Sequence, residues 1–478
     1  MKNKTCLKGS ITIYLLLTFT VLLSFILVIV EGSREHTMKH KIECAMDLSI
    51  YSVFAEYNRE LLNQYDLFFI DASYGKSGAS AENIGNHLKQ YMNENFEVKT
   101  PFGLVKDLMG LTADNVEIND YSLATDESGM ILKRQAVSYI KDLYGADIVK
   151  DLKDQIKECE DHGLLTTDID AKQKENQRII DSIEIPKKKT SDGKWVEQKL
   201  DNPADPVNKS RGILSLILKN DYELSQTNVN LNNYVSHRSL NTGAGLQGRK
   251  AISKADELIF QEYIIKKSGC YTEPKKDSEL TYQLEYILKG KSSDLDNLKA
   301  VVNQLLFMRQ ASNAMYLFND VQKTKEVELI ATAIALLLEV PDLAQYLKES
   351  ILYAWVYAES VYDLRVLLAG GRVPLTKSSS TWHYSLGEMF FFAADKNVSV
   401  TGKEEGMSYV DYLRLLLSFE TEKNKTFRFM DIVEMDIRKK PGNKYFQVDV
   451  CVDDLTANVF VNSSYGRNFS IKRTYFYY

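Results

Sequence analysis

A run of twenty uncharged residues, Ile11 to Val30, constrains the fold more than any other feature of the sequence. Fifteen of them are Leu, Ile, Val or Phe. As an α-helix the run would span roughly 30 Å, the thickness of the hydrocarbon core of a bilayer. Its Thr and Ser hydroxyls can bond to carbonyls of the preceding helical turn. It contains no Asp, Glu, Lys, Arg or His, which argues against a proton or ion path. We therefore expect one transmembrane helix over residues 10–30.

A short basic leader, residues 1–9, precedes this helix and contains no acidic residue. Counting Lys and Arg does not fix the orientation, because Arg34, Lys39 and Lys41 follow the helix closely. We expect the N-terminus in the cytoplasm, because a short tail stays there easily and long domains translocate largely regardless of charge. The bulk of the chain would then be extracytoplasmic. A cleaved signal peptide is the alternative, but the apolar run is long and ends in a poor cleavage sequence at Glu31.

The helical pattern continues past the apolar run to about Leu62. Apolar residues recur there at spacings of three and four, with charged residues mostly between them: Ile42, Met46, Ile50, Val53, Tyr57 and Leu61. The stripe fits the first helix of a soluble domain. It fits equally a membrane helix that runs unbroken into an amphipathic helix and anchors an external domain, as in pilin subunits.

The composition indicates that the chain beyond the apolar run is an ordinary globular protein. The chain has 478 residues, 44% hydrophobic and 26% charged, and a net charge of −6 without a basic stripe, so nucleic acid is not an expected partner. The 28 Tyr residues fit strands better than an adhesive surface. Cys6 lies in the leader, and the other four cysteines show no metal-site or redox spacing. Free thiols and two disulfides both remain open.

Periodicity predicts an α+β fold. The expected divisions after the transmembrane helix are a juxtamembrane helix and first region (31–186), a linker or insertion (187–210), a helical region (211–405) and a C-terminal α+β region (406–478). The clearest predicted helices cover 295–319, 343–368 and 409–417. An antiparallel sheet is expected at the end, from strands at 427–437, 445–452, 459–461 and 469–477.

The sequence motifs that could indicate catalysis, nucleotide binding or metal binding are weak. Gly243 to Gly248 has dinucleotide-loop spacing but follows a polar segment, and the phosphate-loop-like Gly290-Lys291-Ser292 has Glu285 where the motif needs Gly. His36 and His40 lack a third metal ligand nearby. Glu359 and Asp363 share a helix face, where acids are usually exposed. His383 and the Asp453-Asp454 pair have no evident partner. We expect no catalytic, cofactor-binding or metal site, and a chain that is not an enzyme.

Several segments resemble the TadE/TadG-like proteins of tight-adherence (Tad) pilus loci, in particular a long variant from Clostridia-like bacteria that contains a domain of unknown function. The resemblance is strongest at the N-terminus, in residues 8–13, 31–34, 52–62 and 65–71. Weaker similarity extends over nearly the whole chain, for example Glu285 to Leu288, Ala354 to Ser360 and Gly370 to Pro374.

The resemblance implies a pseudopilin-like component of a Tad or type IV-like pilus assembly system. A prepilin peptidase would cut after Gly9, with Lys8 as flanking charge and Ser10 as the new N-terminus. Other pilin-like subunits and the Tad machinery would be partners, through a helix surface formed by Ile11, Tyr14, Leu17, Val21, Phe25 and Val28. Pilin-like proteins usually carry Glu at the fifth mature position, where this chain has Tyr14. A tip, initiating or membrane-retained role fits that departure better than a place in the filament body.

Two other classes remain open. A permanently anchored surface adhesin or binding protein would keep its leader and have no pilus role. A surface hydrolase would need a pocket that gathers acids or histidines from distant parts of the chain.

Overall fold

The computed structural model describes residues 8–97, 109–145, 149–192, 194–200, 202–209, 214–217, 224–245, 252–394, 398, 400 and 405–477, with side chains from residue 11 onward. The chain forms two compact units. Unit 1 consists of residues 1–132, 240–250 and 440–478, and unit 2 of residues 133–239 and 251–439. Unit 1 therefore takes its residues from three separate stretches, whereas the divisions expected from the sequence were contiguous. The predicted α+β class is confirmed.

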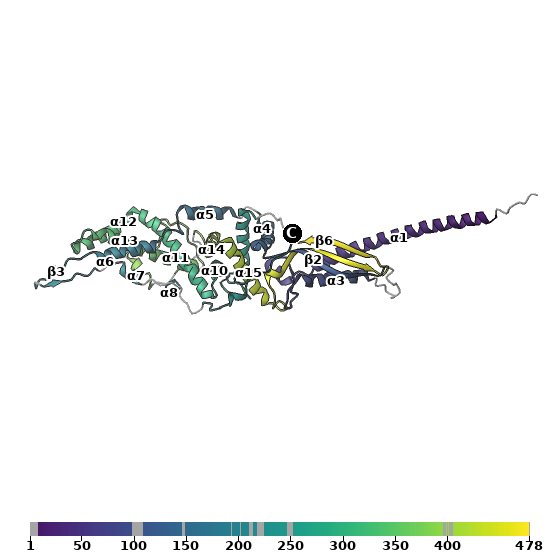
Figure 1. Ribbon diagram of the computed structural model, residues 1–478. Coiled ribbons are helices and arrows are strands. Elements are labelled where there is room, and N and C mark those ends of the chain that lie inside the picture. The colour runs from purple at the N-terminus through teal and green to yellow at the C-terminus, as the bar shows by residue number, and fades with distance from the viewer. Residues whose placement is uncertain are drawn as a thin grey trace, which may run out of the picture. The chain divides into compact units, whose positions relative to one another are not determined.

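Unit 1 begins with the helix α1, Lys8–Phe54, which Figure 1 shows in purple. Its first half is the apolar run, and its second half packs on a sheet (Figure 1). The helix ends eight residues before the predicted Leu62, because the amide of Asn58 bonds instead to the carbonyl of Phe69 at 3.0 Å. Asn58 then caps the short helix α2, Arg59–Tyr65, by accepting from the Leu61 amide. Leu61 remains buried, as predicted.

The sheet of unit 1 is antiparallel and is built around β5, Cys451–Ser463. One edge of β5 pairs with β2, Leu111–Leu123, which carries three register shifts. The other edge pairs with β1, Ile70–Asp71, and with β6, Asn468–Phe476. The β2 pairing places Leu123 opposite Val452 and Leu111 opposite Ser463.

Alternate residues of the sheet face α1 and the helix α3, Ala81–Phe96. Leu455, Ala457, Val459 and Val461 occupy every second position of β5 and are buried, as period-two geometry requires. They form one core with the α1 stripe Met38, Ile42, Met46, Ile50 and Val53, and with Ile84, Leu88 and Met92 of α3. The second half of α1 is thus an amphipathic helix that stabilises the sheet.

Unit 2 is mostly helical. The helix α4, Asp126–Tyr144, leads into it after left-handed residues at Glu127, Ser128 and Gly129. The further helices are α5 Lys150–Asp161, α6 Ile169–Ser182, α7 Asp205–Lys209, α8 Leu214–Ile217, α9 Lys254–Lys267, α10 Gln283–Lys289, α11 Asp294–Asn319, α12 Val321–Leu337, α13 Leu343–Leu368, α14 Tyr409–Ser418 and α15 Glu422–Arg438. Short 3-10 turns lie at Leu231–Asn233 and Glu388–Phe391, and a third at Val448–Val450 belongs to unit 1. The predicted linker contains α7 and an exposed hairpin of β3, Lys188–Lys189, and β4, Trp195–Val196.

The helix α13 is the centre of unit 2. It is buried from Ser350 to Leu368 except at Tyr362, and it packs against α6, α11 and α12. Its bounds match the predicted helix 343–368, and it ends before Gly370, which has a left-handed φ of 88°. A helix that is apolar on all sides belongs in a core.

Two of the predicted C-terminal strands are wrong. Residues 427–437 lie in the helix α15, which Thr421 caps by accepting from the Asn424 amide. Apolar and polar residues alternate there only in part, with acids at 431, 434 and 436. Because α15 is buried on nearly all sides and these acids are paired, the partial alternation carries no strand signal. Residues 445–450 form turns, and β5 begins only at Cys451.

Candidate functional site

The first candidate site is the apolar half of α1. Its predicted assembly residues Ile11, Tyr14, Leu17, Val21, Phe25 and Val28 are each at least 60% exposed. The other apolar residues of this half are exposed as well, so the helix is apolar on every side. Among the described residues, α1 is the single helix long and apolar enough to cross a membrane. These features fit a membrane anchor and also a signal sequence.

The hydroxyls within this half are bonded to the helix backbone, as predicted. Thr18 Oγ1 donates to the Tyr14 carbonyl at 3.1 Å, Thr20 Oγ1 to Leu17 at 2.9 Å and Ser24 Oγ to Thr20 at 2.7 Å. The helix therefore presents no unsatisfied hydroxyl proton at these three positions. Lys8, Gly9 and Ser10 are the first residues of α1, and their side chains lie outside the described residues, as does Cys6.

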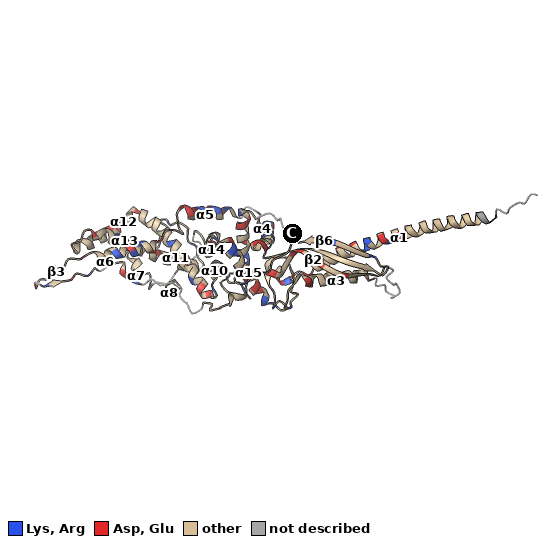
Figure 2. Ribbon diagram, in the orientation of Figure 1, with Lys and Arg blue, Asp and Glu red and all other residues tan. Residues whose placement is uncertain are grey.

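A band of charges marks the end of the apolar half. Glu31 and Arg34 pair at 3.3 Å, and Glu35 pairs with Lys39 at 2.8 Å. The hydrogen bond from Lys39 lowers the pKa of Glu35. Arg467, from the turn between β5 and β6, lies 3.6 Å from Glu31. Figure 2 shows the change along α1 from tan to red and blue. Charged side chains at the end of an apolar helix are typical of the boundary between the hydrocarbon core and water.

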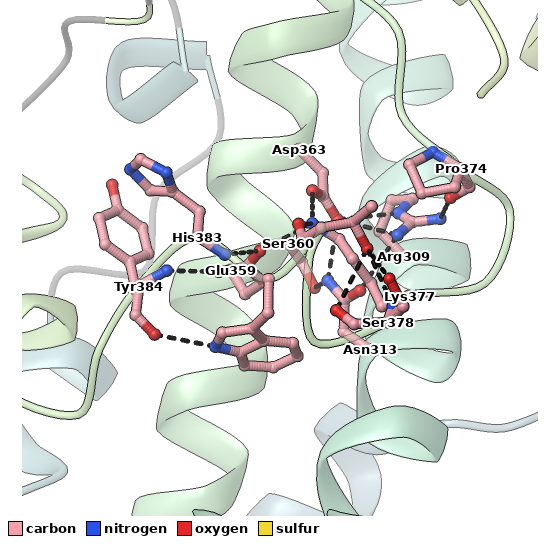
Figure 3. A network of polar contacts seen from close by, with 12 residues as sticks. Arg309, Asn313, Glu359, Ser360, Asp363, Pro374, Lys377, Ser378, His383 and Tyr384 are labelled. Atoms are coloured by element: carbon pink, nitrogen blue, oxygen red, sulfur yellow. Dashed lines mark hydrogen bonds and ion pairs between the residues drawn. The ribbon is translucent and has the colours of Figure 1, made fainter. Parts of the chain in front are cut away.

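The second candidate site is a cluster of buried charges in unit 2 (Figure 3). Arg309 on α11 is fully buried, and its Nη2 lies 3.0 Å from Asp363 Oδ2 on α13. The remaining guanidinium protons of Nη1 go to the carbonyls of Pro374 and Leu375 and to the Tyr412 hydroxyl, each at 2.9 Å. Burial opposes ionisation of Asp363, but the nearby Lys377 and Arg309 hold its pKa below its ordinary value.

Lys377 links the cluster to Glu359, one helical turn before Asp363. Lys377 Nζ lies 2.7 Å from Glu359 Oε1 and 2.7 Å from Asp363 Oδ1, and it donates to the Thr381 carbonyl at 2.8 Å. Glu359 also accepts from the amides of His383 and Tyr384, at 2.9 and 3.0 Å. The prediction that Glu359 and Asp363 are exposed is therefore wrong. Their partners come from distant parts of the chain.

These contacts hold the segment 373–384 against α11 and α13. Trp355 and Trp382 strengthen the attachment, because both indole N–H groups donate to the Tyr384 carbonyl, at 2.9 and 2.8 Å. His383 stacks on Tyr362, with ring centroids 3.6 Å apart. His383 and the segment around it thus do have partners, which the sequence analysis did not identify.

A pocket of about 490 Å³ lies over this cluster. The buried Asp363 and Lys377 line it, together with others that include Tyr362, Trp382, His383 and Arg372. The volume is in the range of small-molecule sites. The three protons of Lys377 are already donated, so a ligand would meet the exposed polar groups of the lining at the rim, which include His383, Arg372, Ser380 and Glu405.

The arrangement gives no direct support to catalysis by Asp363 or Lys377. A lysine that acts as base or nucleophile needs a free, neutral amine, whereas Lys377 is an ion-paired donor. In the parts of the chain that the structure describes, no three His, Cys, Asp or Glu side chains gather to hold a metal ion. His36 and His40 are exposed on α1.

Another polar constellation was missed by the sequence analysis. Ser236 Oγ lies 2.8 Å from His237 Nδ1 and also donates to Asp431, which accepts from the Tyr286 hydroxyl at 2.7 Å as well. Burial raises the pKa of Asp431. Serine contacts both partners here, instead of contacting histidine alone with aspartate behind it, so the order differs from that of a catalytic triad.

The described part of the glycine-rich segment, Gly243 to Gly245, is a loop, as predicted. The amide of Gly243 donates to Asp126 at 3.0 Å, and Ala244 pairs with Tyr121 of β2. A Cβ at Gly243 would lie 2.4 Å from the Tyr121 carbonyl oxygen, which explains why glycine stands there. Gly248 lies outside the described residues. In the phosphate-loop-like motif, Gly290 ends α10 with a left-handed φ of 63°.

Of the Asp453-Asp454 pair, Asp454 accepts a hydrogen bond from the Ser122 hydroxyl.

The family comparison addresses the part of the chain that contains the pocket. A family model described as "Family of unknown function (DUF5702)" matches residues 193–463, more than half of the chain. The chain belongs to the DUF5702 family. The DUF5702 match includes the charge cluster, the pocket and the strand β5, and it does not include α1. Comparison with curated proteins and with solved structures gives no match.

Proposed function

We propose that this DUF5702 chain is a membrane-anchored, pseudopilin-like component of a Tad or type IV-like pilus assembly system. Its N-terminus would lie in the cytoplasm and both compact units outside the cell membrane. The observation that carries the proposal is the continuity of α1: one helix is apolar and exposed over residues 11–30 and then packs into the core of an antiparallel sheet.

This arrangement supports the proposal because it matches what the N-terminal resemblance implies. In pilin-like subunits a single helix serves both as membrane anchor and as the spine of a sheet-containing head. The surface of α1 formed by Ile11, Tyr14, Leu17, Val21, Phe25 and Val28 would contact neighbouring pilin-like subunits. Lys8, Gly9 and Ser10 would form the junction that a prepilin peptidase cuts. With Tyr14 in place of glutamate, a tip, initiating or membrane-retained role is favoured over the filament body.

The decisive experiment is the intact mass of the membrane-extracted protein, with and without a co-expressed prepilin peptidase. Loss of residues 1–9 that depends on the peptidase, and that a Gly9→Leu variant abolishes, would support the proposal. Gly32→Leu is the matched control, because Gly32 lies on the same helix with no atom within 4 Å of an added Cβ. We expect Gly32→Leu to be processed normally.

The rim of the pocket favours a second candidate, a permanently anchored binding protein. The pocket lies within the DUF5702 match and keeps His383, Arg372 and Glu405 exposed. In that case the full-length mass would be unchanged under both conditions, which would reject the pilus mechanism.

A further inference from the structure

The C-terminal half of α12 exposes an apolar surface that its own unit does not cover. Leu329 is 73% exposed, Leu336 62% and Leu337 72%, and Ile330 and Ala333 beside them are also exposed. We call these five residues the α12 patch. Residues 329–338 contain no charge, and Figure 2 shows this part of α12 in tan. Isolated exposed leucines are ordinary, but a contiguous apolar surface marks an interaction site.

The packing of α12 inside unit 2 does not account for the patch. Val327, Ala331 and Ala335 face inward and are fully buried. Ala331 and Ala335 form a small core with Leu343 and Leu347 of α13 and Ile180 of α6. The inner face of α12 therefore has its partners, and the patch is a second apolar face on the same helix.

The sequence of the patch is nearly the same read in either direction. Residues 329–337 read Leu-Ile-Ala-Thr-Ala-Ile-Ala-Leu-Leu, centred on Ala333. Leu329 corresponds to Leu337 and Ile330 to Leu336 across this centre. Large side chains thus stand at both ends and a small one in the middle. When one copy is rotated by 180° about an axis through this centre, large apolar side chains of one copy meet large ones of the other and small meets small, which is compatible with a two-fold interface.

We propose that two copies of this chain associate through the α12 patch, with the helices antiparallel and a two-fold axis passing close to Ala333. Leu329 of one copy then packs against Leu337 of the other, and the small Ala333 side chains let the helix axes approach to about 8 Å, the lower end of the usual range.

Charge placement favours the antiparallel arrangement over a parallel one. Lys325, Glu326 and Glu328 precede the patch, and no charged residue follows it until Glu339. A parallel pair would set each of these charges beside its own copy, which is unfavourable. In the antiparallel pair the two copies of Glu326 lie roughly 21 Å apart along the helix axis, at 1.5 Å per residue. Glu339 of one copy then comes level with Lys325, Glu326 and Glu328 of the other, so it meets charges of both signs instead of its own copy. Four large side chains per copy make a small interface, so a reversible dimer is expected.

The test is disulfide cross-linking of the full chain in isolated membranes, in a background that carries Cys6→Ser and Cys44→Ser. Cys159, Cys270 and Cys451 are buried and stay in place. Ala333→Cys sets two thiols next to the axis and should give a disulfide-linked dimer on mild oxidation. Glu326→Cys, on the same helix but far from its own copy, should not. Equal cross-linking of both variants, or none of Ala333→Cys, would overturn the proposal.

A second substitution distinguishes dimer formation through the α12 patch from contact of the patch with another occupant, such as lipid. Leu336→Glu would bury a carboxylate in the dimer and should reduce Ala333→Cys cross-linking by about tenfold or more. Val321→Glu is the control, since Val321 is 65% exposed on α12 but outside the patch. Tryptophan fluorescence should show unit 2 folded in both. If the patch instead lay in lipid, the Ala333→Cys thiol would resist a membrane-impermeant maleimide without forming a dimer, and this would also reject the proposal.

Discussion

Lys377 holds its ammonium group at a point where two carboxylates and one carbonyl meet. With Arg309 it balances the charges of Glu359 and Asp363, so the cluster is neutral as a whole. Buried ion pairs of this kind add little net stability by being present, but removal of one member leaves an uncompensated charge. The cluster therefore makes the conformation of segment 373–384 depend on single side chains.

We expect Lys377→Met to destabilise unit 2 by about 3 to 5 kcal/mol, since Glu359 and Asp363 would share a buried site with Arg309 as the one remaining cation of the cluster. The measurement is denaturant unfolding followed by tryptophan fluorescence. The three Trp residues of the chain, Trp195, Trp355 and Trp382, all lie in unit 2, so the signal reports this unit.

Arg372→Met is the control for this prediction. Arg372 is exposed and its contact with Asp411 is long, 3.8 Å, so its removal should change the free energy of unfolding by less than about 1 kcal/mol. Equal effects of the two substitutions would contradict the assignment of Lys377 to a buried cluster.

Glu285 on α10 is also a buried acid, but its contacts differ from those of Glu359 and Asp363. Burial raises its pKa to about 7, against hydrogen bonds from the Tyr271 amide and the Tyr409 hydroxyl. Both donors reach Oε1, and Oε2 has no hydrogen-bond partner. Because the folded state holds this proton more tightly than the unfolded chain, stability is greatest below the unfolded pKa and falls as the pH rises toward 7.

Glu285→Gln should remove this pH dependence. Between pH 5 and 8 the variant should gain stability relative to the wild type, by on the order of 3 kcal/mol at most. Unfolding midpoints from tryptophan fluorescence across this range give the result. Glu257, whose pKa burial also raises to about 7, leaves a residual slope in the variant. Glu273 is exposed, so Glu273→Gln should have the same unfolding midpoints as the wild type at every pH. If the midpoints of Glu285→Gln changed with pH in the same way as those of the wild type, the prediction would be refuted.

The sequence carried a partial signal for these sites. Glu359 and Asp363 lie in a stretch of α13, Ile351 to Leu368, that is mostly apolar and in which Arg365 is the one other charged residue, a setting unusual for exposed acids. Their partners Arg309 and Lys377 lie 54 residues before and 14 after Asp363, so spacing alone could not show that the charges meet. The same holds for Asp431, whose partner Ser236 is 195 positions away.

Among the elements, α1 and α13 could be predicted and α15 could not. The stripe of α1 has one buried side, so its helical period is visible, and α13 is long, apolar and ended by glycines. In α15 polar and apolar positions are both buried, because tertiary partners satisfy Asp431, Glu434 and Asp436. Burial on all sides removes the difference between faces on which periodicity depends.

The apolar half of α1 should be the element that holds the chain in the membrane. Val21→Arg with Phe25→Arg should release it, because each substitution raises the insertion free energy by about 3 kcal/mol. The measurement is the fraction retained in membranes after alkaline carbonate extraction. Cys44→Arg with Leu48→Arg is the matched control: both residues are exposed, have the same spacing and lie beyond the apolar run. Equal release of both pairs would contradict the assignment.

In the molecule as a whole, each compact unit has its own hydrophobic core and at least one buried cysteine of its own, whose reactivity can report on the unfolding of that unit. Cys159 and Cys270 are buried in unit 2 and Cys451 in unit 1, whereas Cys44 is exposed on α1. All four are free thiols, so neither core depends on a disulfide. Burial raises the pKa of Cys159 and of Cys270 to about 11, which further suppresses their reactivity.

A Cys6→Ser variant should therefore react with a maleimide at Cys44 alone while it is folded. The three buried thiols should react only as their unit unfolds, and reducing agents should leave the unfolding midpoints unchanged. Peptide mass spectrometry after pulsed labelling in increasing denaturant identifies each site. Labelling of Cys451, Cys159 or Cys270 in native buffer, at the rate of Cys44, would be inconsistent with these cores.

The register of the sheet has a consequence for how such chains evolve and how they can be shortened. Leu123 at the end of β2 stands opposite Val452 at the start of β5, although more than three hundred residues separate them in the chain. Between them the chain returns to unit 1 only at residues 240–250, where Ala244 pairs with Tyr121. Residues within 133–239 or within 251–439 can therefore be gained or lost without altering the pairing of β2 with β5. Length differences among DUF5702 relatives should concentrate there. A fragment cut at residues 193 and 463 would, by contrast, retain β5 without β2 and β6, and expose both edges of an apolar strand to aggregation.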